Sequence, residues 1–233
     1  MDKTGRVLRF LVVFALVALP VGPASAVLVT DTSGFGSSLV VNFSQYAGCT
    51  NFASPGCAAP LDVGGLVGRT VNFTGTSPVA SVFNGGFGLG SNGSWNSGRN
   101  GYAGLNNGDG FLRFTFADGP VSAVGAFMNY TPGLGGDPMI QALDAGGNLL
   151  EGYNLAFLAP ISTPGATDDG AFRGFVHGSA DIAAIQFLNS FTVVDNLTFS
   201  PVPEPATLLL VSTTAAGLGL ARWRQRRRIK QEL

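Results

Sequence analysis

Short apolar runs separated by Gly, Asn, Asp and Pro repeat through residues 27–200, and they constrain the fold more than any other feature. In the clearest run, Phe111–Phe116, apolar side chains alternate with Arg113 and Thr115. Such alternation is typical of a β-strand with one buried face and one solvent-exposed face. We expect further strands at Ser38–Tyr46, Arg69–Gly75, Val79–Phe83, Val121–Tyr130, Met139–Leu143, Leu149–Tyr153, Ala171–His177, Ile182–Asn189 and Val193–Phe199.

The connections and the composition favour a sheet-based fold. Asp144–Asn148 joins two of the runs through a Gly-Gly pair and predicts a β-hairpin. Gly and Pro together make up 47 of 233 residues (34 + 13), which disfavours long helices, and 18 Phe need a core. About ten short strands need two packed layers to bury that many rings. We therefore predict an all-β fold, an antiparallel two-sheet sandwich of the jelly-roll kind, over residues 27–200.

The N-terminal residues 1–26 have the pattern of a secretory signal peptide. Three basic residues precede the apolar run Phe10–Leu19. As a helix this run would span about 15 Å, too short for a bilayer core of about 30 Å. Ala24-Ser25-Ala26 is a small-residue pattern that a signal peptidase accepts, so the mature chain is expected to start at Val27. The alternative is an uncleaved N-terminal membrane anchor.

The C-terminal residues 201–233 combine three features. A Pro-rich spacer precedes residues 206–223, which as a helix would span about 27 Å and could cross a thin bilayer. A basic cluster that would stop translocation follows, which places the preceding chain outside the cell. This cluster contains Arg222, Arg224, Arg226, Arg227 and Arg228. The alternative is a soluble amphipathic tail.

The order of motif, apolar span and basic tail resembles the PEP-CTERM sorting signal of bacterial exosortase substrates. The motif residues are Val202, Pro203, Glu204 and Pro205. The resemblance implies recognition by a membrane-embedded exosortase and processing near the motif. It also implies that the protein crosses the inner membrane, is held transiently by its C-terminal helix, and then reaches the cell surface or the extracellular matrix. It does not imply what the exported domain does.

The charge of the exported region excludes nucleic-acid binding. Residues 27–200 contain four Arg, no Lys and eleven acidic residues, a net charge of −7 (4 − 11). Proteins that bind nucleic acid neutralise phosphates with clusters of Lys and Arg, which are absent from this sequence range.

Cys49 and Cys57 are the only cysteines and both fall in the region expected to be exported. An oxidising compartment favours a disulfide between them, closing one short loop. Two free thiols or a metal-binding pair are the alternative, although this spacing is not usual for zinc.

The segment from Asn84 to Gly110 contains ten Gly and six Asn in 27 residues, which predicts a long flexible loop. Within it, Trp95, Arg99 and Tyr102 are candidate glycan-binding residues, because sugar sites combine aromatic stacking with hydrogen bonds to hydroxyls. The alternative is a solvated low-complexity loop without a ligand.

The last predicted strand carries a carboxylate on an apolar face. Strict alternation puts Asp195 on the same face as Leu197 and Phe199, toward the core. A buried carboxylate must accept backbone N–H bonds, pair with an arginine such as Arg173, or bind a cation, for which Ca²⁺ is the best match. Asp31 could supply a second oxygen if the first and last strands pair. Calcium is therefore a candidate structural ligand, and a purely hydrogen-bonded Asp195 is the alternative.

Candidate catalytic residues are few. His177 is the only histidine, and no nucleophile elbow, zinc helix or phosphate loop is present in the sequence. Asp168 and Asp169 are neighbours on a polar run that we interpret as a surface loop, not as the separated carboxylates that glycoside hydrolysis needs. The closing strand also loosely resembles that of jelly-roll carbohydrate-binding-like domains. We therefore expect a non-enzymatic surface or matrix protein with weak adhesion to exopolysaccharide; the alternative is a secreted glycan-active hydrolase.

Overall fold

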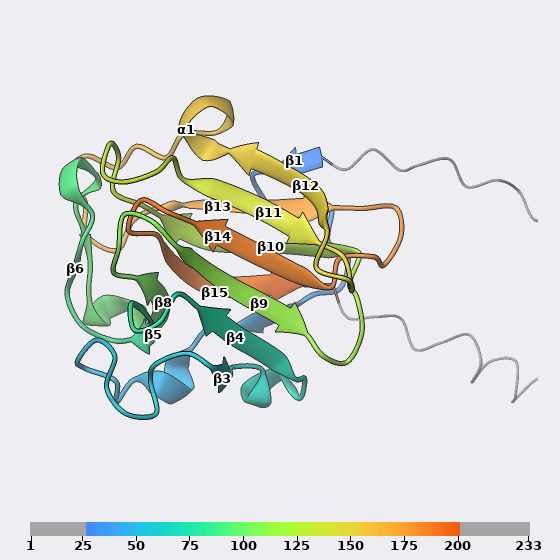
Figure 1. The fold of residues 1–233 in the computed structure, drawn as a ribbon, viewed down its shortest axis with the longest axis horizontal. Helices are drawn as coiled ribbons and strands as arrows, with labels where there is room; N and C mark the ends of the chain where they lie inside the picture. The colour runs from blue at the N-terminus through green and yellow to red at the C-terminus, as the bar shows by residue number, and fades with distance from the viewer. Residues whose placement is uncertain (1–26, 201–233) are drawn as a thin grey trace, which may run out of the picture.

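The computed structural model of this chain describes residues 27–200, and these residues form two antiparallel β-sheets (Figure 1). The strands of the first sheet are, in spatial order, β1 (Val27–Val29), β13 (Ala171–Val176), β10 (Ala123–Asn129), β15 (Val193–Phe199), β8 (Tyr102–Leu105) and β5 (Ala80–Phe83), with β2 (Leu39–Val41) also paired to β15. Those of the second sheet are β12 (Leu149–Asn154), β11 (Met139–Leu143), β14 (Ala184–Leu188), β9 (Phe111–Phe116), β4 (Val71–Gly75) and β3 (Leu61–Asp62).

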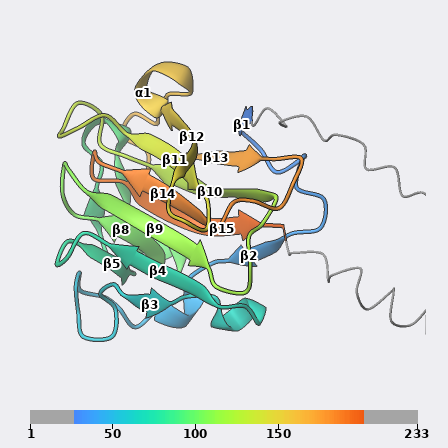
Figure 2. The ribbon, with the colours of Figure 1, turned by 45° about the vertical axis from the view of Figure 1, so that its right-hand side comes forward.

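A short hairpin and one turn of helix complete the structure. The hairpin consists of β6 (Phe87–Gly88) and β7 (Ser94–Trp95), and the helix is α1 (Leu155–Leu158). Consecutive strands from β9 to β15 switch between the two sheets, except at the hairpin β11–β12. The sheets lie one behind the other in Figure 2. The prediction of an all-β antiparallel sandwich is confirmed at this level.

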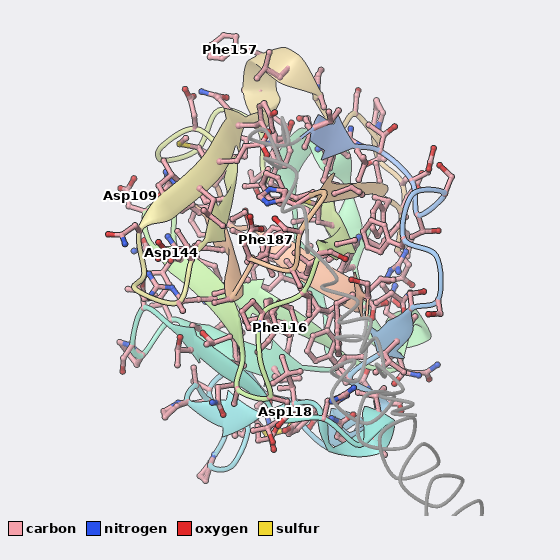
Figure 3. The ribbon with its side chains drawn as sticks, turned by 90° about the vertical axis from the view of Figure 1, so that its right-hand side faces the viewer. Asp109, Phe116, Asp118, Asp144, Phe157 and Phe187 are labelled. Carbon is pink, nitrogen blue, oxygen red and sulfur yellow. A yellow bond between two sulfur atoms is a disulfide. The ribbon has the colours of Figure 1, made fainter. Side chains whose placement is uncertain are left out.

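The sandwich core lies between the two sheets. Phe114 and Phe187 from the second sheet and Val124 and Phe175 from the first belong to one cluster and are fully buried. Figure 3 shows Phe116 and Phe187 inside the molecule, whereas Phe157 projects from α1 into solvent. The alternation predicted for β9 is confirmed, because every second residue of that strand is buried. All of these contacts form within residues 27–200, a length at which core burial suffices for independent folding.

The predicted strands and the hairpin are largely confirmed, with one shortened strand. The β11–β12 turn is closed by Asp144, whose carboxylate accepts the backbone N–H groups of Gly146 and Asn148, each at 2.8 Å. The run predicted as Ser38–Tyr46 is a strand only over β2. It ends because Phe43 has a left-handed backbone conformation (φ 55°), which starts a 3₁₀ turn at Ser44–Tyr46.

The predicted disulfide is confirmed. Cys49 and Cys57 are bonded, with 6.0 Å between their Cα atoms. The closed loop is attached to the edge of the first sheet, where the backbone N–H of Asn84 donates to the carbonyl of Cys49 and that of Val82 donates to the carbonyl of Cys57, each at 2.8 Å.

The predicted signal peptide (1–26), sorting motif, helix 206–223 and basic cluster lie outside the described residues. Between residues 27 and 200, no helix has the length and apolar character needed to cross a membrane.

Candidate functional site

The Gly-rich segment Asn84–Gly110 is not the flexible loop that the sequence predicts. It contains β6, β7, two 3₁₀ turns and β8, and it is attached to the first sheet through a second hydrophobic cluster. Figure 1 shows β6 at the end of the molecule where β5 and β8 lie. The cluster consists of Phe83, Phe87, Leu89, Trp95, Tyr102 and Val193. The prediction failed because a high Gly content signals a loop, whereas a few buried rings are enough to hold the segment in place.

Trp95 and Tyr102 are core residues and not an exposed stacking pair. Both side chains are fully buried, and their rings pack edge to face with 5.3 Å between centroids. The Trp95 indole N–H donates to the carbonyl of Asp169 at 2.6 Å, and the Tyr102 hydroxyl donates to the carbonyl of Gly85 at 2.5 Å. Burial, followed by the charge of Asp168, raises the pKa of Tyr102 above its ordinary range. The expectation that a sugar stacks on these two rings is therefore corrected.

Arg99, the third candidate of that segment, is positioned by its own turn and by two aromatic rings. A 3₁₀ turn at Ser97–Arg99 places it, and the Asn96 side chain starts this turn by accepting the N–H of Gly98. The guanidinium carbon of Arg99 lies 4.5 Å from the centroid of the Trp95 ring and 4.2 Å from that of Phe127. Such cation–π contacts fix the plane of the guanidinium group.

Each guanidinium nitrogen of Arg99 also donates one hydrogen bond. Nη1 donates to Oδ2 of Asp195 at 3.0 Å. Nε donates to the backbone carbonyl of Asp168 at 3.1 Å, and Nη2 donates to the same oxygen. Arg99 therefore connects β15, the segment before β13, and its own turn.

Asp195 is buried, with 3% of its surface exposed, and its partner is Arg99. The proposed partner Arg173 is wrong: its guanidinium donates instead to the backbone carbonyl of Ala159. The Oδ1 atom of Asp195 accepts the backbone N–H of Asn196 at 2.6 Å. Burial raises the pKa of the Asp195 carboxyl to about 6, although the hydrogen bond and charge of Arg99 oppose the shift.

A β-bulge places Asp195 on the face opposite to the one predicted. In the pairing of β15 with β10, Thr198 lies opposite Gly125 and Asp195 lies opposite Phe127. Three steps along β15 therefore match two steps along β10, which leaves one extra residue in β15. After the bulge, Leu197 and Phe199 face the sandwich core, as Val194 does before it. Asp195 precedes the bulge and shares its face with Val193, which belongs to the second cluster. The carboxylate therefore lies on the outer face of the first sheet, under the Gly-rich segment.

Arg99 and Asp195 line a polar cavity of about 440 Å³, which we call the Arg99 pocket. Its other lining residues are Asn42, Ser44, Gly98, Asn100, Asp168 and Asn196. Three of them, Asn100, Asp168 and Asn196, hold a left-handed backbone conformation with φ of 60°, 56° and 48°. Non-glycine residues rarely adopt this conformation, and in folded proteins such residues concentrate at functional sites.

Asp168 enters the pocket from a segment that the sequence marked only as a surface loop. Its backbone N–H donates to the carbonyl of Ser94 at 2.8 Å, so the loop is attached to β7. Its Oδ1 atom accepts the N–H of Asn96 at 2.6 Å. Gly98 is required beside it, because a Cβ there would lie 2.4 Å from Oδ2 of Asp168. The polar run 162–170 contained no signal for this pairing, which joins residues 72 positions apart.

The expected calcium pair is not assembled. Asp31 is exposed and its carboxylate accepts the backbone N–H of Ser33 at 2.8 Å. It follows β1, and β13 and β10 separate β1 from β15, so the first and last strands do not pair. Within residues 27–200, no group of three or more His, Cys, Asp or Glu side chains is arranged to hold a metal ion.

His177 joins the two sheets at the end of β13. Its Nδ1 lies 2.6 Å from Oδ1 of Asp181, and its Nε2 lies 3.4 Å from Oε2 of Glu151 on β12. Burial raises the pKa of Glu151, whose other oxygen accepts the Tyr153 hydroxyl. The His177 side chain therefore lies between Asp181 and Glu151 of β12. Neither His177 nor these partners line the Arg99 pocket.

Comparison with known proteins identifies the C-terminal signal. Residues 201–228 match the PEP-CTERM protein-sorting motif, as the sequence predicted. No curated protein matches the chain. A cleaved adhesin domain of Lys-gingipain is 12% identical, with a TM-score of 0.38 over 71% of this chain and 99% of that one. A mutant lectin-binding domain of lectinolysin complexed with Lewis b is 10% identical, with a TM-score of 0.30 over 53% of this chain and 92% of that one. At these TM-scores, neither resemblance identifies a ligand for this chain.

Proposed function

We propose that the chain is a non-enzymatic cell-surface or extracellular-matrix protein whose β-sandwich binds polysaccharide weakly in the Arg99 pocket. The sorting motif at residues 201–228 implies export and recognition by an exosortase at the cell envelope. Transient anchoring by residues 206–223, followed by release to the surface or matrix, is part of this proposal. The polysaccharide ligand rests on a different observation, the lining of the pocket.

The observation that carries the ligand proposal is the polar lining of the pocket. The amide side chains of Asn100 and Asn196 make no hydrogen bond within residues 27–200, and both residues line the cavity. Each amide offers two N–H donors and one oxygen acceptor. A ligand with many hydroxyl groups, which both donate and accept, satisfies such a lining, whereas an apolar ligand would leave it unpaired.

The expected affinity of one site is low. No aromatic side chain lines the Arg99 pocket, so a bound sugar gains hydrogen bonds without ring stacking. Weak binding suits a protein displayed in many copies on a repeating polymer, because linked sites raise the overall avidity by about 10² or more.

The direct test is retention of residues 27–200 on the exopolysaccharide of the native host. Asn100→Gly and Asn196→Gly remove the two amides, and glycine adopts the same left-handed backbone without strain. Asn106→Ala is the control, because Asn106 is exposed and lies outside the pocket. Saturable retention that the two glycine variants lose and the control keeps is the expected result. Retention that is absent, or equal in all variants, would refute the proposal.

A glycan-active hydrolase is the second candidate. One observation favours it: Asp168 and Asp195 line the same pocket, and the pKa of Asp195 is raised to about 6. General acid catalysis uses a carboxyl group with a raised pKa opposite an ionised one. The ion pair with Arg99 argues against Asp195 as a proton donor, because it stabilises the ionised form. Turnover of the host polysaccharide that Asp168→Asn abolishes without lowering the melting temperature would establish this function in place of binding alone.

A further inference from the structure

The charges in the Arg99 pocket do not balance. One guanidinium group, Arg99, faces two carboxylates, Asp168 and Asp195. Arg99 and Asp195 form an ion pair at 3.0 Å. Of the two pocket carboxylates, Asp168 therefore has no ion-pair partner within residues 27–200. The domain as a whole, pocket included, has a net charge of −7 over residues 27–200. The pocket therefore repels anions.

Arg99 is the one cationic residue that lines the pocket, and its charge is already paired with that of Asp195. Each of its three guanidinium nitrogens donates one hydrogen bond, to Asp195 or to the carbonyl of Asp168, and the group also contacts the rings of Trp95 and Phe127. A carboxylate or sulfate on a sugar would compete with Asp195 for this cation and would also meet the charge of Asp168. Breaking one partner away from a buried pair is strongly unfavourable.

Asp168 has the one carboxylate oxygen in the pocket that remains free to bind. Its Oδ1 atom accepts the N–H of Asn96, whereas Oδ2 accepts no hydrogen bond within residues 27–200. Both oxygens of Asp195 are used, by Arg99 and by the N–H of Asn196. A ligand group that donates hydrogen bonds and carries positive charge satisfies Oδ2 of Asp168 best, because it adds the attraction of opposite charges to a hydrogen bond that a hydroxyl could also donate.

We propose that the Arg99 pocket selects amino sugars with a free ammonium group, which Asp168 binds through Oδ2, while Asn100 and Asn196 bind neighbouring hydroxyls. This inference rests on the proposed polysaccharide-binding function and adds its ligand class. Neutral sugars bind through the two amides alone and more weakly. Uronic acids and sulfated sugars are excluded by the charge of Asp168.

The test compares three oligosaccharides of equal length by titration calorimetry with residues 27–200. The probes are a glucosamine oligomer, its N-acetylated counterpart and a galacturonic acid oligomer, at a pH below the pKa of the sugar amine. The glucosamine oligomer is expected to bind about tenfold or more tightly than the N-acetylated one, and the uronate not at all. Added salt should reduce this preference in the unmodified protein, since salt screens exposed charges.

Asp168→Asn should abolish the preference, and asparagine tolerates the left-handed backbone at this position. Asp169→Asn is the matched control. It removes the same charge at the next residue, and Asp169 does not line the pocket. A preference that survives Asp168→Asn, or that Asp169→Asn removes equally, would overturn the proposal. If the glucosamine oligomer and its N-acetylated counterpart bind equally well, and Asn100→Gly loses this binding, the preference for amino sugars is wrong but glycan binding in the pocket stands. If the protein binds neither the three probes nor the host polysaccharide, both the amino-sugar preference and the proposed polysaccharide binding are wrong.

Discussion

Arg99 Nη1 lies 3.0 Å from Oδ2 of Asp195, and the guanidinium of this ion pair contacts the neighbouring, mutually stacked rings of Trp95 and Phe127. The pair connects a turn of the Gly-rich segment to the outer face of the first sheet. It also fixes one wall of the pocket to which we assign ligand binding. The ion pair therefore supports both the fold and the shape of the pocket.

Removing Arg99 should destabilise the domain. Arg99→Ala leaves the buried Asp195 carboxylate without its cation, a change that costs about 3–5 kcal/mol in the free energy of unfolding. The double variant Arg99→Ala/Asp195→Asn should recover part of this loss, because no charge is then buried alone. Urea denaturation of residues 27–200 measures both values. A loss below about 1 kcal/mol for Arg99→Ala would show that the pair is energetically unimportant.

Asp195 should make stability depend on pH. Its pKa in the folded protein is raised from its ordinary value of 3.8 to about 6. Between these values the folded protein binds more protons than the unfolded one, so the free energy of unfolding falls as the pH rises through this window. The total change is on the order of 2–3 kcal/mol. The difference in unfolding free energy between the wild type and Asp195→Asn, measured against pH, isolates this contribution; a difference that stays constant with pH would contradict the raised pKa.

Trp95 should behave as a core residue. Trp95→Ala is expected to cost about 3–5 kcal/mol of unfolding free energy, because it empties the second cluster and uncovers Arg99. Trp95→Phe should cost less, since it keeps an apolar ring. Phe157→Ala, at a side chain that is 76% exposed, should change stability by no more than about 0.5 kcal/mol. Normal stability of Trp95→Ala together with lost glycan retention would instead restore the stacking role that the sequence suggested.

The disulfide should stabilise one loop. Replacing Cys49 and Cys57 by Ser is expected to lower the free energy of unfolding by about 2.5 kcal/mol on the chain-entropy account. The loop between them lies away from the Arg99 pocket lining, so binding should persist below the melting temperature. Thermal melts of the double Ser variant and of the reduced wild type should agree, and a double Ser variant that melts at the wild-type temperature would contradict the prediction.

Glu204 should determine sorting. Glu204→Ala is expected to leave the protein in the membrane fraction, because the residue lies within the matched PEP-CTERM motif. Glu232→Ala is the control, since it changes the same residue type beyond the matched residues 201–228. Fractionation of cells expressing each variant gives the result. Normal release of Glu204→Ala would argue against exosortase dependence.

Most of the longer strands were predictable because each carries its own local signal, whereas the short strands β1, β3, β6, β7 and β8 were not predicted. In β9, polar and apolar residues alternate with the period of a strand, and the burial follows that period. The hairpin at Asp144–Asn148 was predictable for the same reason, since its turn residues determine its geometry.

The site was only partly predictable because it depends on contacts between distant segments. Arg99 and Asp195 were both candidates, but nothing local indicated that they pair. The bulge in β15 adds one residue, which reverses the face of every side chain before it. We expected the rings of Trp95 and Tyr102 to be exposed because they lie in a Gly-rich segment. Their burial depends on contacts with the sheet beneath the segment, which the local sequence does not indicate.

Calorimetric titration of residues 27–200 with fragments of the host exopolysaccharide tests whether the Arg99 pocket binds glycans. Saturable binding by the wild type and by Asn106→Ala is expected. Asn100→Gly/Asn196→Gly should lose affinity at least about tenfold at an unchanged melting temperature. Binding of equal strength in the double variant, or no binding by the wild type, would show that the pocket is not a glycan site.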